Sequence, residues 1–393
     1  MEWFDFGVYG FVAASIGRTF FPSASATASL LSSLAVFGVS FFFRPLGGVI
    51  FGAIGDRFGR RPALATEIVF MGAATTLIAL LPSPKTIGIA APILLVALRC
   101  LQGVSVGGEW TGSSAFLVEH SPPRRRGLYG STISATSALG ALGGGLVGLV
   151  LTLSLSAESI DTWGWRLPFL IAAPITVVGF YLRLRLGETP VYSRLQQQGR
   201  TQRSPLRSLG RRNLRPIGLV LAFASVMGVG YYYLATFAVT YLSSTAGFSR
   251  VTSLLVASAG LAIYTALCPL AGLLSDHIGR RLTLLYGCGG MVVIGFPAFL
   301  LIGSGSIVGA LVGLAAVSVC QAMVNVIGVV VLVELFPPAV RASGSSIGYN
   351  LGLALFGGPA PLIATALVAQ TGLSVAPAFY LCAVSLIAFA VLF

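Results

Sequence analysis

Long apolar stretches, separated by short polar segments, follow one another along almost the whole chain. A helix that crosses a bilayer needs about 20 predominantly apolar residues, and these stretches have that length. They predict an all-α membrane protein with twelve transmembrane helices, at residues 3–20, 31–54, 62–82, 89–118, 127–153, 165–184, 215–243, 251–274, 283–303, 306–334, 343–368 and 374–393.

The composition agrees with burial in lipid. Of the 393 residues, 56% are hydrophobic and 9% are charged, whereas soluble domains hold about 45–50% apolar and about 25% charged residues. A soluble fold of this length is therefore excluded.

Basic residues lie in short segments at alternate ends of the predicted helices. The net charge of +13 does not indicate nucleic-acid binding, because the arginines form no face with interleaved aromatic residues. They follow the positive-inside rule and predict an inner-membrane protein with both termini in the cytoplasm. The cytoplasmic side would hold Arg57, Arg60, Arg61, Arg124 to Arg126, the arginines between 183 and 215, Arg280, Arg281 and Arg341, and the opposite side Arg18, Lys85, Arg166 and Arg250.

The chain divides into two halves that repeat each other. A long polar segment, residues 187–215, separates the sixth predicted span from the seventh, and we expect an N-terminal bundle at 1–184, a cytoplasmic linker at 185–214 and a C-terminal bundle at 215–393. Two different motifs recur at nearly the same offset, which indicates an internal duplication. They are Gly52-Ala-Ile-Gly-Asp56-Arg-Phe-Gly-Arg60-Arg61 with its copy at 272–281, and Glu119-His-Ser-Pro-Pro-Arg-Arg-Arg126 with its copy at 334–341.

With these motifs the chain resembles the major facilitator superfamily and, more narrowly, the metabolite:proton symporter family. The resemblance implies two pseudo-symmetric six-helix bundles and transport by alternating access, with no enzymatic activity and no cofactor. The closer match rests on residues 2–6, 44–48, 99–103, 107–109, 163–169, 188–190, 349–350 and 357–359.

The narrower family carries dicarboxylates, citrate, shikimate and zwitterionic osmolytes. Its members usually have a polar lead-in before the first helix, whereas this chain opens on Met1-Glu2-Trp3. Its osmosensing members carry a C-terminal coiled coil, and this sequence ends at Phe393. We therefore expect a small organic acid as substrate and keep a zwitterionic osmolyte such as betaine or proline as the alternative.

Charged side chains inside the predicted spans are the candidates for substrate binding. Each costs at least ~2.5–3.5 kcal/mol at membrane depth, so it usually has a function and a partner. We place Glu2 at the membrane face and leave it out. A spacing of seven residues places Gln102 and Glu109 on the same face of a helix, and a spacing of four does the same for Asp5 and Tyr9. The candidates are Asp5, Tyr9, Arg44, Arg99, Gln102 and Glu109.

We expect Arg44 and Arg99 to hold a carboxylate, because a guanidinium pairs with carboxylates in a bidentate way. Asp5 or Glu109 would carry the coupled proton, since burial and a nearby arginine act in opposite directions on a carboxyl group. The alternative is a structural ion pair between helices, for example Asp5 with Arg44.

By resemblance, the repeated loop motifs form a cytoplasmic gate. Their arginines can pair with acids or bind carbonyls at the ends of helices, and glycine permits close helix contact. The alternative is that these arginines only set the topology. The gate candidates are Gly52, Asp56, Arg60, Arg61, Glu119, Arg126, Asp276, Arg280, Arg281, Glu334 and Arg341.

Glycines at every fourth position, 140, 144 and 148 and again 344, 348 and 352, predict smooth helix faces for close packing. No Gly-Lys-Ser/Thr sequence follows them, which argues against phosphate binding. The five cysteines are isolated and the two histidines fall in predicted loops, so we expect no metal site and no membrane enzyme.

The leading hypothesis is a monomeric proton-coupled symporter of a small organic acid. A proton-driven exporter of the same fold is a further alternative, and coupling to sodium instead of protons stays open. The sequence does not identify the substrate.

Overall fold

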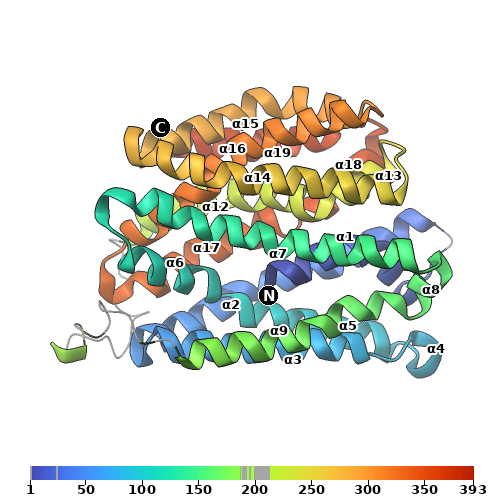
Figure 1. Cartoon of the computed structure of the whole chain (residues 1–393), viewed down its shortest axis with the longest axis horizontal. Helices are drawn as coiled ribbons and strands as arrows, with labels where there is room; N and C mark the ends of the chain where they lie inside the picture. Colours follow the sequence, from blue (N-terminus) through green and yellow to red (C-terminus); the bar gives the residue numbers. More distant parts are fainter. Residues whose placement is uncertain (1, 24, 186, 188–192, 194–195, 199–212) are drawn as a thin grey trace.

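The computed structural model describes residues 2–23, 25–185, 187, 193, 196–198 and 213–393. Its helices run side by side along the long axis of the molecule (Figure 1). In chain order they are α1 (Glu2–Phe20), α2 (Ala26–Phe58), α3 (Arg60–Leu80), α4 (Pro84–Ile87), α5 (Ala90–Val106), α6 (Glu109–His120), η1 (Pro123–Arg125), α7 (Arg126–Ser154), α8 (Ala157–Thr162), η2 (Gly164–Arg166), α9 (Leu167–Arg185), α12 (Leu214–Tyr232), η4 (Tyr233–Phe237), α13 (Ala238–Ser244), α14 (Arg250–Ile278), α15 (Arg280–Ile302), α16 (Ile307–Glu334), η5 (Pro338–Val340), α17 (Arg341–Gly352), η6 (Leu353–Gly357), α18 (Ala360–Thr371) and α19 (Ala376–Leu392).

The helices match the predicted spans. Among the described residues, ten helical segments are long and apolar enough to cross a membrane, and α19 is a shorter apolar helix. The remaining long helix, α1, has 19 residues and carries Glu2, Asp5 and Arg18. With these two, the predicted twelve-helix architecture is confirmed.

Three predicted spans are less regular than expected. The fourth is broken, because α5 ends at Val106 and α6 begins at Glu109. The seventh and eleventh contain the π-helical turns η4 and η6. Such π turns are frequent at functional sites.

Glycines let α2 and α5 approach closely and so place the two buried arginines. A Cβ atom at Gly47 would overlap the Val104 carbonyl of α5, and one at Gly103 would overlap the Ser40 carbonyl of α2. Arg44 and Arg99 lie on these two helices, close to the glycines that join them.

The glycine repeats lie in equivalent helix contacts of the two halves. Gly144 of α7 packs on the Phe4 carbonyl of α1, and Gly352 of α17 packs on the Leu221 carbonyl of α12. The predicted close packing at these glycines is confirmed. Since α1 and α12 begin the two halves, the contacts also reflect the duplication.

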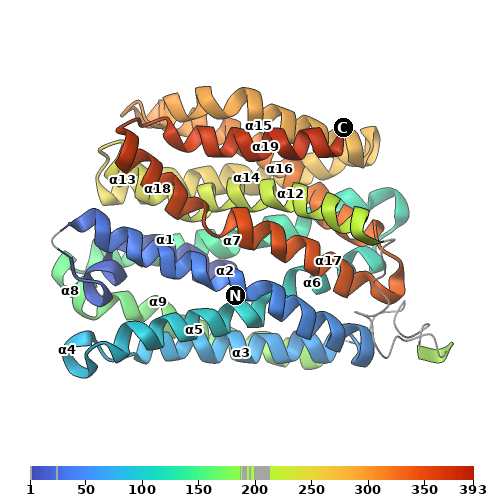
Figure 2. The same ribbon diagram turned by 180° about the vertical axis from the view of Figure 1, so that it is seen from behind.

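The halves meet through two pairs of long helices. In Figure 1, α14 lies along α7, with α3, α5 and α9 on one side of this pair and α15, α16 and α19 on the other. From behind, α17 lies beside α2 (Figure 2). The "linker end" below is the end of the bundle at which α2 ends and α12 begins; the "far end" is the opposite one.

Candidate functional site

The first helix begins in the middle of the bundle (Figures 1 and 2). Glu2 is therefore buried at 2% exposure, and its Oε1 accepts a hydrogen bond of 2.8 Å from Arg44 Nη1. The interpretation that placed Glu2 at the membrane face is wrong, because it took the start of the apolar stretch for the edge of the membrane.

Asp5 forms a second buried ion pair, with Arg99. Arg99 Nη1 donates to Asp5 Oδ2 over 2.6 Å, and the guanidinium lies 4.2 Å from the centre of the Tyr9 ring. Tyr9 in turn donates to the carbonyl of Ser33 in α2 over 2.7 Å. The structure thus pairs Asp5 with Arg99 and not, as in the alternative interpretation, with Arg44.

Both arginines keep unused hydrogen-bond donors. Arg44 Nη2 and Arg99 Nε and Nη2 are buried without a hydrogen-bond partner in the described part of the chain. Arg44 Nε reaches Asn350 Oδ1 of α17 at 3.4 Å, so Arg44 lies where the two halves meet. A carboxylate that entered here would find free guanidinium N–H groups.

Gln102 and Glu109 do not form the continuous polar stripe expected for an unbroken helix. Gln102 donates to Thr75 Oγ1 of α3 over 2.7 Å, whereas Glu109 accepts from Arg183 Nη2 of α9 over 2.6 Å. The break between α5 and α6 separates the two residues, and their side chains form hydrogen bonds with different helices.

Aromatic side chains from both halves surround Trp3. Its ring centre lies 5.2 Å from that of Trp110, 4.8 Å from Tyr231 and 6.3 Å from Tyr232, and Trp110 stacks on Tyr349 at 5.9 Å. We call these five residues the aromatic cluster. The hydroxyls of Tyr231 and Tyr232 and the indole N–H of Trp110 are buried without a partner among the described residues.

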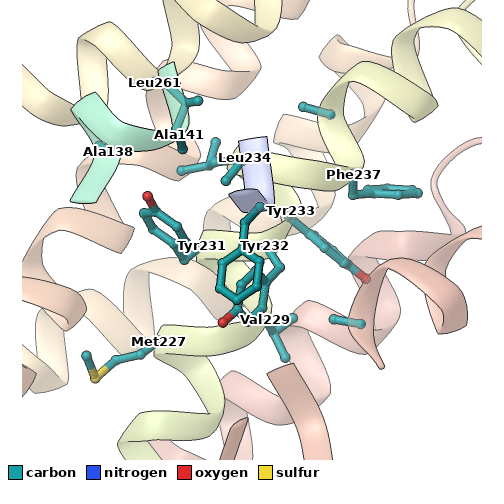
Figure 3. Close-up of a cluster of buried hydrophobic side chains, with 14 of the residues drawn as sticks. Ala138, Ala141, Met227, Val229, Tyr231, Tyr232, Tyr233, Leu234, Phe237 and Leu261 are labelled. Atoms are coloured by element: carbon teal, nitrogen blue, oxygen red, sulfur yellow. The ribbon is translucent and has the colours of Figure 1, made fainter. Parts of the chain in front are cut away.

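This cluster was not predicted from the sequence. The run Tyr231-Tyr232-Tyr233 inside an apolar span could have indicated it. Successive residues of a helix point about 100° apart, so three consecutive tyrosines cannot all face lipid. Figure 3 shows these three rings pointing away from one another. The Tyr233 hydroxyl donates to the Pro377 carbonyl over 3.1 Å, inside the C-terminal half.

A cavity of about 240 Å³ borders the cluster and the buried acids. Glu2, Trp3, Glu109 and Trp110 line it. It lies between α1, α6 and α7, within the N-terminal half. We call it the central cavity.

At the linker end, two aspartates join the halves in equivalent ways. Asp56 Oδ2 of α2 accepts from the backbone N–H and the hydroxyl of Ser343, at 3.2 Å and 2.7 Å. Asp276 of α14 accepts from the backbone N–H groups of Gly127 and Leu128, at 2.9 Å and 3.0 Å. Each carboxylate lies at the N-terminus of a helix of the other half, where the helix dipole favours negative charge.

Ion pairs between the halves flank these contacts. Arg341 Nη1 lies 2.7 Å from Glu119 Oε1, and Arg126 Nη1 lies 3.0 Å from Glu334 Oε1. Within the C-terminal half, Arg280 lies 2.7 Å from Asp276 and 3.9 Å from Glu334. The structure is therefore closed at the linker end.

Other gate candidates bind within their own half or pack between the halves. Arg61 donates to the Leu184 carbonyl and Arg281 to the Phe393 carbonyl. A Cβ atom at Gly52 would come within 3.2 Å of the Ser343 Cα of the other half. The side chain of Arg60 lies outside the described part of the structure.

Two bundles of membrane-spanning helices, with buried ion pairs inside the N-terminal one and ion pairs between the two at the linker end, define the class of polytopic secondary transporters. A sequence model of the Major Facilitator Superfamily matches residues 1–358, and the chain belongs to this superfamily. It is accordingly a transporter and not an enzyme, and transporters of this superfamily need no cofactor.

Curated relatives cover nearly all of the chain. A proline/betaine transporter of Escherichia coli strain K12 is 40% identical over 98% of this chain and 79% of its own length. A glycine betaine/proline/ectoine/pipecolic acid transporter, OusA of Dickeya dadantii, is 38% identical with the same coverage. These relatives favour the osmolyte alternative over the organic acid that we took as the leading hypothesis.

Solved structures confirm the fold. The proton:xylose symporter XylE, bound to 6-bromo-6-deoxy-D-glucose, superposes with a TM-score of 0.78 over 100% of this chain and 92% of its own. At 20% identity the likeness is one of fold alone.

Proposed function

We propose that this chain imports a small zwitterionic osmolyte, such as proline or a betaine, together with protons. The aromatic cluster beside Arg44 carries the proposal. A zwitterion needs a donor group for its carboxylate and a surface for its cationic nitrogen. Aromatic ring faces attract quaternary ammonium groups, and the free guanidinium N–H of Arg44 supplies the donor.

The two binding elements are close together. Arg44 Nε lies 3.4 Å from Asn350, the residue after Tyr349. The Phe41 ring, 5.1 Å from the Arg44 guanidinium, is 5.0 Å from Tyr232. An organic acid would use the arginine but not the rings. The relatives that transport proline and betaine support the same choice.

Transport would proceed by alternating access in the cell membrane. We propose that residues 1–184 rock against residues 215–393 around this site, connected by 185–214, with the linker end in the cytoplasm. The contacts of Asp56, Asp276, Glu119 and Glu334 would then hold the cytoplasmic gate closed. One chain supplies both sides of the aromatic cluster, which supports a monomer as the functional unit.

Asp5 and Glu2 are the acids next to the arginines that would bind substrate. In the proposal one of them is protonated from outside when substrate arrives and frees its arginine for the substrate carboxylate. This exchange of partners would couple proton and substrate movement.

Uptake by proteoliposomes tests the proposal. With an inside-alkaline pH gradient we expect accumulation of labelled proline and glycine betaine that a protonophore abolishes. Trp110→Leu should raise the KM for glycine betaine roughly tenfold, the loss of one cation–π contact of about 1.4 kcal/mol. Trp163→Leu, which changes an exposed tryptophan, is the control.

Three results would contradict the proposal. Uptake of succinate or citrate without uptake of proline or betaine would restore the organic-acid hypothesis. Accumulation that depends on a sodium gradient and is unchanged by the protonophore would exclude the proton as the coupling ion. Efflux against the pH gradient would indicate an exporter.

A further inference from the structure

Another buried acid, Glu67 of α3, lies beside the break between α5 and α6. It is 1% exposed, and its Oε2 has no hydrogen-bond partner among the described residues. Its Oε1 lies directly against the backbone break between α5 and α6, because a Cβ atom at Gly108 would overlap it. The predicted candidates did not include Glu67, and neither the substrate site nor the gate uses it.

The Arg183 guanidinium contacts both Glu109 and the turn of α3 that leads to Glu67. Its Nη2 donates to Glu109 over 2.6 Å, and its Nη1 donates to the Leu64 carbonyl over 2.5 Å. Among the described residues Glu67 forms no ion pair of its own.

One buried acid deep inside the N-terminal half has no arginine partner among the described residues. Apart from the gate acids Asp56 and Glu119, the buried or partly buried acids of the described spans are Glu2, Asp5, Glu67 and Glu109, and Arg44, Arg99 and Arg183 pair with all of these except Glu67. An unpaired buried charge is costly. A proton on Glu67 removes this cost, so Glu67 is the acid of this group that we expect to hold an exchangeable proton.

Two neighbouring cavities lie between Glu2 and Glu109 and the linker end. The central cavity contains Glu2 and Glu109 in its wall. A second cavity of about 270 Å³ is lined by Arg61, Arg183 and Gly187. Ser113, Ile133 and Thr136 line both cavities, so the two spaces adjoin along α6 and α7.

We infer that these cavities form a proton path through the N-terminal half, with Glu109 and Glu67 as its proton carriers. The path joins the substrate site to the solvent at the linker end. Its lining residues come from α1, α3, α6, α7 and α9, together with Gly187, so a proton can pass while the contacts of α2 with α17 and of α7 with α14 stay closed.

The proposed step is a simple proton transfer. The O–H bond of a protonated Glu109, which lines the central cavity, breaks, a cavity water accepts the proton, and the carboxylate that remains pairs with Arg183. Glu67 lines neither cavity, and in the proposal its O–H bond breaks as an O–H bond forms again on Glu109, beside Gly108. Water in the second cavity then delivers the proton to the solvent at the linker end. This inference rests on the proposed proton coupling, and it adds where the proton travels.

The test compares coupled and uncoupled transport of proline in proteoliposomes. Glu67→Gln should keep exchange of labelled for unlabelled proline, which needs no net proton movement. It should lose at least tenfold in accumulation driven by a pH gradient, and lose the internal acidification that a trapped pH dye reports during uptake. Glu158→Gln, in the exposed segment between α7 and α9, is the control and should change none of these.

A second pair of variants tests the passage itself. Ser113→Leu narrows the junction of the two cavities and should uncouple transport in the same way, whereas Ser113→Ala should not. Accumulation at wild-type level in Glu67→Gln would overturn the proposal. If Glu67→Gln does not fold, wild-type accumulation in Ser113→Leu overturns it equally.

Failure of the two proposals can be told apart. A wild-type protein that exchanges proline but shows no accumulation under a pH gradient contradicts proton coupling as a whole. A wild-type protein that is coupled, with Glu67→Gln and Ser113→Leu equally coupled, contradicts the path alone.

Discussion

Arg99 holds its guanidinium between a carboxylate and a ring face. The 2.6 Å ion pair with Asp5 and the Tyr9 ring at 4.2 Å both stabilise the positive charge, and the two side chains of the pair are buried at 2% and 1% exposure. Removing one member of a buried pair leaves the other charge without compensation. Arg99 is therefore needed for stability as well as for the proposed binding of substrate.

We predict that Arg99→Gln abolishes proline accumulation and destabilises the protein by about 3–5 kcal/mol, the usual loss when a buried ion pair is broken on one side. Uptake and thermal unfolding in detergent measure the two effects. Adding Asp5→Asn should recover much of the stability without restoring accumulation.

The exposed pair Arg18–Asp161 is the matched control. Its nitrogen–oxygen distance is 2.8 Å, but the side chains are 48% and 29% exposed. Arg18→Gln should change stability by less than about 1 kcal/mol, as is usual for surface pairs, and leave uptake intact. Unchanged accumulation in Arg99→Gln would show that the buried pair is only structural.

The sequence identified Asp5, Arg44, Arg99 and Glu109 as charges at membrane depth, but not their partners. Pairing depends on the rotation and depth of each helix, which hydrophobicity does not define. Glu2 was misplaced because α1 begins in the middle of the bundle. Arg183 was taken as one of a basic run that sets topology, although its side chain reaches back to Glu109.

At the scale of helices, glycine contacts set how closely neighbouring spans approach. The glycine repeats predicted that α7 and α17 pack closely on other helices, which is confirmed, but they did not identify the partners, α1 and α12. The break between α5 and α6 and the π turns η4 and η6 were not predicted, because a span keeps its apolar composition whether its backbone hydrogen bonds are regular or shifted.

Gly228 of α12 faces Gly357, at the end of the π turn η6. A Cβ atom at Gly228 would lie 2.8 Å from the Gly357 Cα, so the helices must separate to accept it. We predict that Gly228→Ala lowers stability by about 1–3 kcal/mol through overpacking, seen as a lower midpoint of thermal unfolding.

A Cβ atom at Gly218, on the same helix, would have no neighbouring atom from outside its own turn of helix within 4 Å. Gly218→Ala should raise the midpoint slightly, because alanine favours the helix by up to about 1 kcal/mol over glycine. Equal behaviour of the two variants would contradict the idea that the glycine contact sets the distance between α12 and η6.

Over the whole molecule, the closed linker end rests on contacts that follow the duplication. Asp56 contacts the start of α17, and Asp276 contacts the start of α7. Glu119 pairs with Arg341, and Glu334 with Arg126. Each acid belongs to one half and its partner to the other. The sequence predicted these residues from the repeated motifs, and expected the arginines that follow the loop glycines to pair with acids or bind carbonyls at helix ends. Arg280 does approach Glu334, at 3.9 Å, and Arg61 and Arg281 bind carbonyls, but the shorter pairs of Glu119 and Glu334 are with Arg341 and Arg126.

We predict that Arg341→Glu weakens closure at the linker end, because it places a second carboxylate where the guanidinium met Glu119 at 2.7 Å, and like charges repel strongly where water is scarce. Amide hydrogen exchange should accelerate at residues 123–128 and 338–343, where the halves meet. Proline accumulation should fall at least tenfold, since a gate that stays open at one end prevents alternating access.

The charge swap Glu119→Arg with Arg341→Glu separates this electrostatic effect from a general loss of folding. It restores opposite charges across the same interface, so protection from exchange should return at both segments and accumulation should recover in part. The Arg126–Glu334 pair is untouched in both variants and provides an internal reference. If the swap exchanges as fast as Arg341→Glu alone, attraction between these two side chains is not what keeps the halves together.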